Sequence, residues 1–177
     1  IRDSILNAIG NTPIVKLKNI VPIGCGEIYV KLEAFNPTGS KKDRMALSMI
    51  SGAEKRGVLK KGMTVVEYSG GSTGAGLAFV CSLKGYNFRL VTADVFGKEK
   101  IDLMRSLGAN LEIIKSSDGK INKELITKMI KKADQISKEP NTFFTNQLNN
   151  TDVIEGFVPL GEEILDQLNG NIDAVCD

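Results

Sequence analysis

The segment 36–44, which reads NPTGSKKDR, contains the lysine best placed to do chemistry, Lys42. Its Asn-Pro and Thr-Gly pairs are typical of turns, and an apolar helical pattern begins at Met45, with Ser40 at the expected N-cap position. A helix N-terminus carries partial positive charge, which disfavours an ammonium group and favours a neutral amine. A neutral lysine is a nucleophile suited to forming a Schiff base with a carbonyl compound. On these residues alone, a pair of solvated loop lysines, Lys41 and Lys42, is the simpler interpretation.

A glycine-rich loop follows the strand predicted for residues 63–68. Residues 69–76 read SGGSTGAG, and an apolar helix over 77–83 comes next. Glycines allow the backbone to approach a ligand closely, hydroxyl groups add hydrogen-bond donors, and the N-terminus of the next helix favours an anion. The loop therefore predicts a pocket for a carboxylate or a phosphate.

Together these segments resemble the cysteine synthase (O-acetylserine sulfhydrylase) and cystathionine β-synthase family of pyridoxal-phosphate enzymes. The segment 36–44 matches that family's Asn-Pro…Ser-x-Lys-Asp-Arg motif, and residues 69–74 are similar to its Thr-Ser-Gly-Asn-Thr-Gly substrate loop. Residues 9–15, IGNTPIV, also resemble the family's opening Ile-Gly-Asn-Thr-Pro-Leu-Val, and residues 31–33 lead into the lysine turn as they do in the family. Two matched motifs in the right order are far more specific than either one alone.

The resemblance implies roles for individual residues. Lys42, the lysine directly before Asp-Arg, is the implied site of pyridoxal-phosphate attachment, whereas Asp43 and Arg44 are expected to be structural. Ser72 takes the place of the family's asparagine, which contacts the cofactor's ring oxygen, so it is an expected cofactor contact. The implied substrate-binding residues, around the α-carboxylate, are Ser69, Gly70, Gly71, Ser72, Thr73 and Gln147.

The loop departs from the family pattern at three positions. Ser69 replaces threonine, Gly70 replaces serine, and Ser72 replaces asparagine. Serine has a shorter reach than asparagine toward the cofactor ring. Backbone amides do much of the carboxylate binding, so that role survives the replacements, while the identity of the substrate is left open.

The composition of the 177-residue chain excludes several classes of function. It contains no histidine, which removes Ser-His-Asp and Cys-His catalysis and histidine-based zinc or iron sites. Acid–base chemistry must then use Lys, Asp, Glu, Tyr or a cofactor. A formal net charge of +2 gives no electrostatic support for nucleic-acid binding. The sequence also has no apolar run as long as a membrane span and no signal-peptide pattern.

The three cysteines lack paired spacing, which fits a reducing cytoplasm better than a disulfide framework. Cys81 lies in a predicted apolar helix and Cys176 in a predicted apolar strand, so both thiols are expected to be buried. Cys25 has no partner at a typical spacing.

Alternating elements predict the fold. Strands are expected at 13–17, 27–33, 63–68, 88–91, 111–114, 142–145 and 172–176, and helices at 4–9, 45–53, 77–83, 101–107, 121–136 and 152–168. Strands that alternate with helices of this length predict a parallel, doubly wound α/β sheet. The resemblance makes this the tryptophan synthase β-subunit-like arrangement of fold-type II enzymes. Residues 37–149 are expected to form a central α/β domain with the lysine and the loop, and 1–36 and 150–177 parts of a second, incomplete one.

The last predicted strand, 172–176, ends the sequence without a following helix, which would leave an exposed sheet edge. In the family this strand precedes a Gly-Thr-Gly-Gly-Thr loop that binds the cofactor phosphate, and the sequence contains no such loop. The sequence is therefore expected to be part of a longer protein.

The resemblance implies β-replacement or β-elimination on an activated serine- or cysteine-type amino acid. Cysteine synthesis from O-acetylserine and sulfide is the first choice, and cystathionine β-synthase-like or cysteine lyase activity is the alternative. Lys42 would hold pyridoxal phosphate and remove the α-proton, and a thiol or sulfide would be the second substrate. The family makes a homodimer the expected form, and the cysteines, the net charge and the lack of a membrane-length apolar run lead us to expect a cytoplasmic protein without nucleic-acid or membrane partners.

Two other classes of function remain open on the sequence. The glycine spacing in 69–76 also matches short-chain NAD(P) oxidoreductases, although that fingerprint normally follows the first strand, and no Tyr-x3-Lys pair occurs here. A non-catalytic α/β binding or regulatory module is the third possibility, because the phosphate loop is missing.

Overall fold

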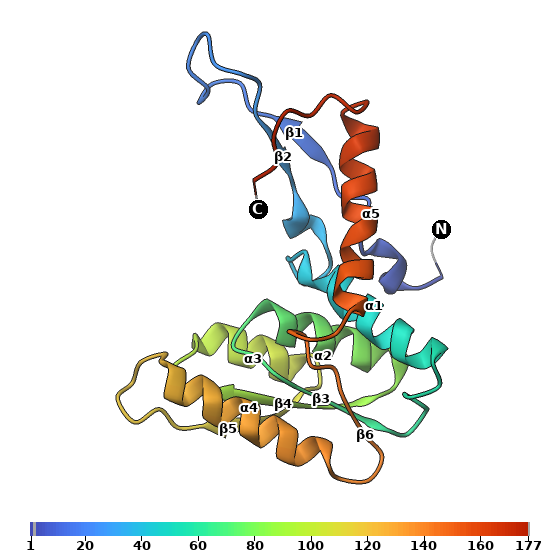
Figure 1. Ribbon diagram of the computed structural model, residues 1–177, viewed down its shortest axis with the longest axis vertical. Coiled ribbons are helices and arrows are strands. Elements are labelled where there is room, and N and C mark those ends of the chain that lie inside the picture. The colour runs from blue at the N-terminus through green and yellow to red at the C-terminus, as the bar shows by residue number, and fades with distance from the viewer. Residues whose placement is uncertain (2, 177) are drawn as a thin grey trace.

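The main sheet of the protein has four parallel strands in the order β5-β4-β3-β6. They are β3 (Thr64–Tyr68), β4 (Asn87–Ala93), β5 (Asn110–Ile114) and β6 (Thr142–Phe144). The computed structural model describes residue 1 and residues 3–176. Helices α1 (Lys42–Lys55), α2 (Ser72–Lys84) and α3 (Lys98–Ser106) cover one face, and α4 (Lys123–Ser137) covers the other (Figure 1). The predicted parallel, doubly wound α/β fold is confirmed.

Alternation along β3 builds a core on each face of the sheet. Val65 is buried among residues of α1, α2 and α3, whereas its neighbour Val66 is buried against α4. Successive side chains of a strand point to opposite faces, so one apolar strand supplies both cores. The buried side chains of α4 recur at helical spacing: Leu125, Met129, Ala133 and Ile136. The amphipathic helix predicted over 121–136 is thereby confirmed, with Asn122 as its N-cap.

The order of the strands creates a switch point beside β3. The chain runs outward from β3 through β4 to β5, then returns to place β6 on the other side of β3. In open α/β sheets, ligands bind beyond the carboxyl ends of the strands at such a point. Here those ends continue into residues 69–71 after β3 and residues 145–147 after β6.

A second group of elements lies on the outer side of α1 (Figure 1). It contains an antiparallel pair of strands, β1 (Ile14–Lys16) and β2 (Tyr29–Lys31), and the helix α5 (Asp152–Gln167), which packs against α1. Short 3₁₀ turns occupy Ile5–Ala8 and Glu33–Phe35. The division of the chain into 37–149 and two flanking segments stays a prediction.

Three local predictions are wrong. Residues 172–176 form no strand, because an extended segment needs a pairing partner to be stable and none of the described strands pairs with it. Cys176 is consequently exposed, while Cys81 is buried as predicted. Ser40 is not the N-cap of α1, since that position belongs to Lys41, which makes no side-chain capping bond.

Helix α2 begins earlier than its apolar pattern indicates. It starts at Ser72, so residues 72–76 of the predicted loop are the first turns of the helix. Glycine adds no apolar side chain to a periodic pattern, which is why the pattern becomes visible only at Leu77. In the part of the chain that the structure describes, no helix has both the length and the apolar character needed to cross a bilayer.

Candidate active site

The lysine turn is closed by hydrogen bonds just before α1. Lys42 is the first residue of the helix, and its backbone N–H donates to Ser40 Oγ at 3.2 Å. The carboxylate of Asp43 accepts a bond from the Thr38 backbone N–H at 2.7 Å and a second from the Thr38 hydroxyl. Burial raises the pKa of Asp43, against the effect of these two bonds. The turn therefore holds Lys42 at the N-terminus of α1, as the sequence predicts.

Both lysines of the turn lie near one aromatic ring. The Nζ atom of Lys42 is 5.5 Å from the centre of the Phe157 ring, and that of Lys41 is 6.0 Å away. Phe157 belongs to α5, so the C-terminal helix contributes to the surroundings of the predicted cofactor lysine.

Ser69 organises the entry into α2. Its Oγ accepts bonds from the backbone N–H groups of Gly71 and Gly74, both at 3.2 Å. Two N–H groups at this helix N-terminus are therefore satisfied from within the chain. Of the predicted contact residues that follow, Thr73 is buried and Ser72 is exposed.

The ring of Phe96 leaves no space for a side chain at Gly70. A Cβ atom at this position would lie 2.1 Å from Cε1 of Phe96, which stands in the segment between β4 and α3. The position thus has no room for the serine of the family pattern. At Gly71, by contrast, the nearest atom to an added Cβ is Lys100 Nζ, at 4.0 Å.

Gly70→Ser should destabilise the protein by about 1–3 kcal/mol, the usual effect of overpacking a filled site. Thermal unfolding measures this effect, and Gly71→Ser is the matched control because no atom lies closer than 4.0 Å to its added Cβ. Combining Gly70→Ser with Phe96→Val should recover part of the loss. Equal unfolding temperatures for Gly70→Ser and Gly71→Ser would contradict this assignment.

A second glycine brings the two motifs together. A Cβ atom on Gly76 of α2 would lie 3.1 Å from Asp43 Oδ1 and 3.2 Å from the carbonyl oxygen of Lys42. The first turn of α1 and the first turns of α2 are therefore packed in direct contact. The lysine motif and the glycine motif lie side by side, as a shared active site requires.

Gln147 lies at the same edge of the sheet. Its side-chain Nε2 donates to the carbonyl oxygen of Tyr68 at 3.1 Å, and its backbone N–H donates to Glu67 Oε2 at 2.9 Å. Tyr68 is the last residue of β3 and directly precedes Ser69. The structure thus places Gln147 beside the start of the glycine segment, across the switch point.

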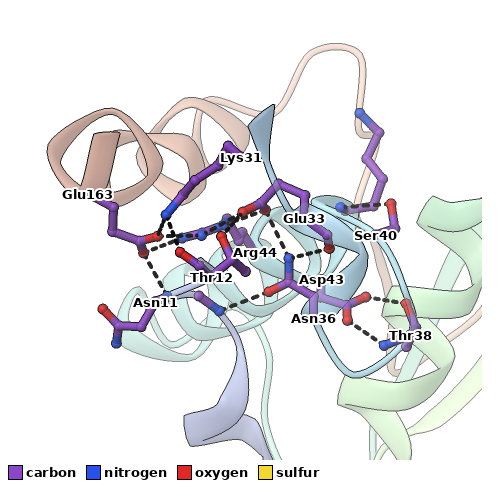
Figure 2. A network of polar contacts seen from close by, with 12 residues as sticks. Asn11, Thr12, Lys31, Glu33, Asn36, Thr38, Ser40, Asp43, Arg44 and Glu163 are labelled. Carbon is purple, nitrogen blue, oxygen red and sulfur yellow. Dashed lines mark hydrogen bonds and ion pairs between the residues drawn. The ribbon is translucent and has the colours of Figure 1, made fainter. Parts of the chain in front are cut away.

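Arg44 forms the centre of an ionic network beneath the lysine turn (Figure 2). Its guanidinium donates two bonds to Glu33, at 2.8 and 2.9 Å, and two to Glu163, at 2.7 and 2.8 Å. Lys31 Nζ adds a contact of 2.7 Å to Glu163. Burial pushes the pKa of Glu163 upward, but the bonds from Arg44 and Lys31 outweigh it and lower the value to about 2.

The network also binds the N-terminal motif. Thr12 Oγ1 donates to Glu33 at 2.6 Å, and the Gly10 N–H donates to Asn36 Oδ1 at 2.8 Å. The segments 9–15, 31–33 and 36–44, which carry the resemblance, therefore meet in one place. The expected structural role of Arg44 agrees with these contacts, but its partner Glu163 was not foreseen.

The residues present fit lysine-bound pyridoxal phosphate. Helix α1 begins with the primary amine of Lys42. Helix α2 begins with the exposed hydroxyl of Ser72, and no atom lies closer than 4.0 Å to a Cβ added at the preceding Gly71. Both helix starts lie at one edge of the sheet. Among the described residues, no group of three His, Cys, Asp or Glu side chains could hold a metal ion.

Comparisons with known proteins agree with this arrangement. A cysteine synthase from Staphylococcus aureus is 41% identical over 176 residues, which cover 97% of this chain and 54% of the relative. An O-ureido-L-serine synthase from Streptomyces lavendulae is 39% identical over 148 residues, covering 84% of this chain and 44% of that protein.

Solved structures agree as well. A hydrogen sulfide-producing enzyme from Fusobacterium nucleatum superposes with a TM-score of 0.88 at 37% identity, covering 98% of this chain and 55% of the other. O-acetyl serine sulfhydrylase isoform 3 from Entamoeba histolytica gives a TM-score of 0.87 at 34% identity, covering 98% and 52%. The chain spans about half the length of these proteins.

The family model of pyridoxal-phosphate dependent enzymes matches residues 5–176. That match includes the lysine turn, the glycine segment and the network around Arg44, and it favours pyridoxal phosphate over the NAD(P) alternative. The chain belongs to the pyridoxal-phosphate dependent enzyme family.

Proposed function

We propose that this chain forms the lysine and carboxylate-binding side of a cysteine synthase-like enzyme that makes cysteine from O-acetylserine and sulfide. The observation that carries the proposal is the direct packing of Gly76 against the first turn of α1, which sets the lysine and glycine motifs side by side. Relatives named cysteine synthase and O-acetyl serine sulfhydrylase support the same choice.

Each residue has a defined task under this proposal. Lys42 holds the cofactor through its amine and then carries the proton removed from the substrate's α-carbon. Pyridoxal phosphate, when bound, supplies the electron sink that stabilises charge at that carbon. The segment 69–73, the Thr73 hydroxyl and the Gln147 amide bind the α-carboxylate, with the backbone N–H groups of Gly70, Ser72 and Thr73 as donors, because those of Ser69 and Gly71 are already bonded within the chain. Ser72 contacts the cofactor ring.

The residues expected to select the substrate differ between this chain and its family. Gly70 and Ser72 depart from the family pattern, and one relative is an O-ureido-L-serine synthase. Production of O-ureido-L-serine is therefore the second candidate activity, and a cystathionine β-synthase-like or cysteine lyase reaction is the third. A homodimer is the proposed form of the enzyme, as the resemblance implies, and the cytoplasm is its proposed location, as the unpaired spacing of the cysteines favours.

Thr73→Val should weaken amino-acid binding about tenfold or more, since a charge-assisted hydrogen bond is lost from a buried position. Cofactor content should be unchanged, because Lys42 still holds the cofactor. A spectral titration with serine, O-acetylserine and cysteine measures both quantities in the protein that contains this chain.

Ser72 variants are the matched control for that experiment. Ser72→Ala should shift the cofactor absorbance, and Ser72→Asn should be tolerated because it restores the family's residue. If Thr73→Val binds all three amino acids as tightly as the wild type, the assignment of the carboxylate site fails.

A further inference from the structure

Glu67 is a fully buried carboxylate at the carboxyl end of β3. Its Oε1 accepts a bond from the Tyr68 N–H at 2.8 Å. Its Oε2 accepts two more, from Thr145 Oγ1 at 2.8 Å and from the Gln147 N–H at 2.9 Å. Three donors from two strand ends therefore converge on one side chain.

Glu67 is, like Asp43, a fully buried carboxylate that is not paired with a cation among the described residues. Glu33 and Glu163 are paired with cations, whereas no ion pair to Glu67 exists among the residues that the structure describes. A buried carboxylate without a cation is costly, and an apolar residue in a central strand would avoid that cost. The stability of the sheet alone gives no reason for glutamate at this position.

The position of the three bonds supplies a reason. The ladder between β3 and β6 ends at the pair Val66–Phe144, followed by a bond from the Thr145 N–H to the Val66 carbonyl at 3.1 Å. Beyond this point the two segments are joined by the side chain of Glu67, which accepts a hydrogen bond from the Gln147 N–H, instead of by backbone pairing. The two segments that bind the carboxylate in the proposed function begin directly after these residues.

We propose that Glu67 is a positioning residue that fixes the Gln147 segment against the start of the glycine segment and so sets the geometry of the α-carboxylate site. This inference rests on the proposed function. Glu67 itself does not touch the substrate. It holds two backbone N–H groups and one hydroxyl, and through them it orients the Gln147 side chain, whose amide reaches the Tyr68 carbonyl at 3.1 Å.

Two variants test the inference in the protein that contains this chain. Glu67→Gln places an NH₂ group against a donor, and Thr145→Val removes the hydroxyl donor. Each should raise the Kd for O-acetyl-L-serine at least about tenfold while the absorbance and Kd of the cofactor stay as in the wild type. Thr145→Ser, which keeps the hydroxyl, should restore the affinity.

A ligand that lacks the carboxylate separates positioning from general damage. O-acetylethanolamine, the amine without the α-carboxylate, should bind the wild type and both variants equally. Because Glu67 and Thr145 share one bond, the double variant Glu67→Gln/Thr145→Val should lose less affinity than the product of the two single losses.

The outcomes distinguish this inference from the proposed function. If the wild type shows no response to amino acids, the proposed function fails. If the wild type responds but Thr145→Val binds O-acetyl-L-serine with unchanged affinity, the positioning role is overturned, whether or not Glu67→Gln folds. Equal losses for O-acetyl-L-serine and O-acetylethanolamine would also overturn it.

Discussion

Replacing Lys42 with alanine should reduce turnover by at least about a thousandfold and remove the visible absorbance band of lysine-bound pyridoxal phosphate. The amine at the first position of α1 is the proposed attachment point and proton carrier, and the other lysine of α1, Lys55, lies at the opposite end of the helix. Absorbance spectra and steady-state rates of the purified protein measure the two effects.

Lys41→Ala is the matched control. The two lysines are adjacent and have nearly the same distance to the Phe157 ring, 6.0 and 5.5 Å, so they differ mainly in their place on the helix. Lys41→Ala should keep the absorbance band. If Lys41→Ala loses the band and Lys42→Ala keeps it, the assignment of the cofactor lysine is wrong.

Glu163→Gln should lower the free energy of unfolding by about 3 kcal/mol at neutral pH, because it leaves the buried Arg44 and the nearby Lys31 without a full counter-charge. Chemical denaturation measures the loss. Glu162→Gln is the control, since Glu162 is the exposed neighbour on the same helix, and its change should stay within about 0.5 kcal/mol of zero.

The difference in stability between the wild type and Glu163→Gln should depend on pH. The pKa of Glu163 is lowered from 4.5 to about 2, so the ionised side chain stabilises the folded state fully above pH 4.5. That contribution is lost as the pH falls from 4.5 toward 2. The difference in stability between wild type and Glu163→Gln should therefore shrink over this range. A difference that stays constant down to pH 2 would mean that the ion pair is not its source.

The fold could be predicted from the sequence wherever a periodic pattern was strong. The alternation of apolar strands and amphipathic helices indicates a parallel sheet because each element must bury one face. The start of α2 was missed since Gly74 and Gly76 carry no apolar side chain. The prediction of a strand at 172–176 was wrong because pairing is a property of two segments, and a sequence pattern describes only one.

The candidate site also contains residues that the sequence predicted and contacts that it did not. Lys42, Thr73 and Gln147 were predicted as site residues from motif matches, and the structure brings their segments to one edge of the sheet. Phe96 beside Gly70 was missed, because its contact joins segments without any shared pattern. Glu67 could have been noticed, since a glutamate in the strand sequence TVVEY is unusual among apolar neighbours.

The ion pair between Arg44 and Glu163 also has a consequence for the order in which the protein can be assembled. The two residues are 119 positions apart, so at 5–20 residues per second a ribosome needs roughly 6 to 24 seconds to make the second after the first. The ionic network beneath the turn that carries Lys42 cannot be completed until α5 has been synthesised and has closed this long loop. Completion of the lysine's surroundings is thereby a late event in folding, and an amine that captures the cofactor only after that event would mark chains whose C-terminal helix is already in place.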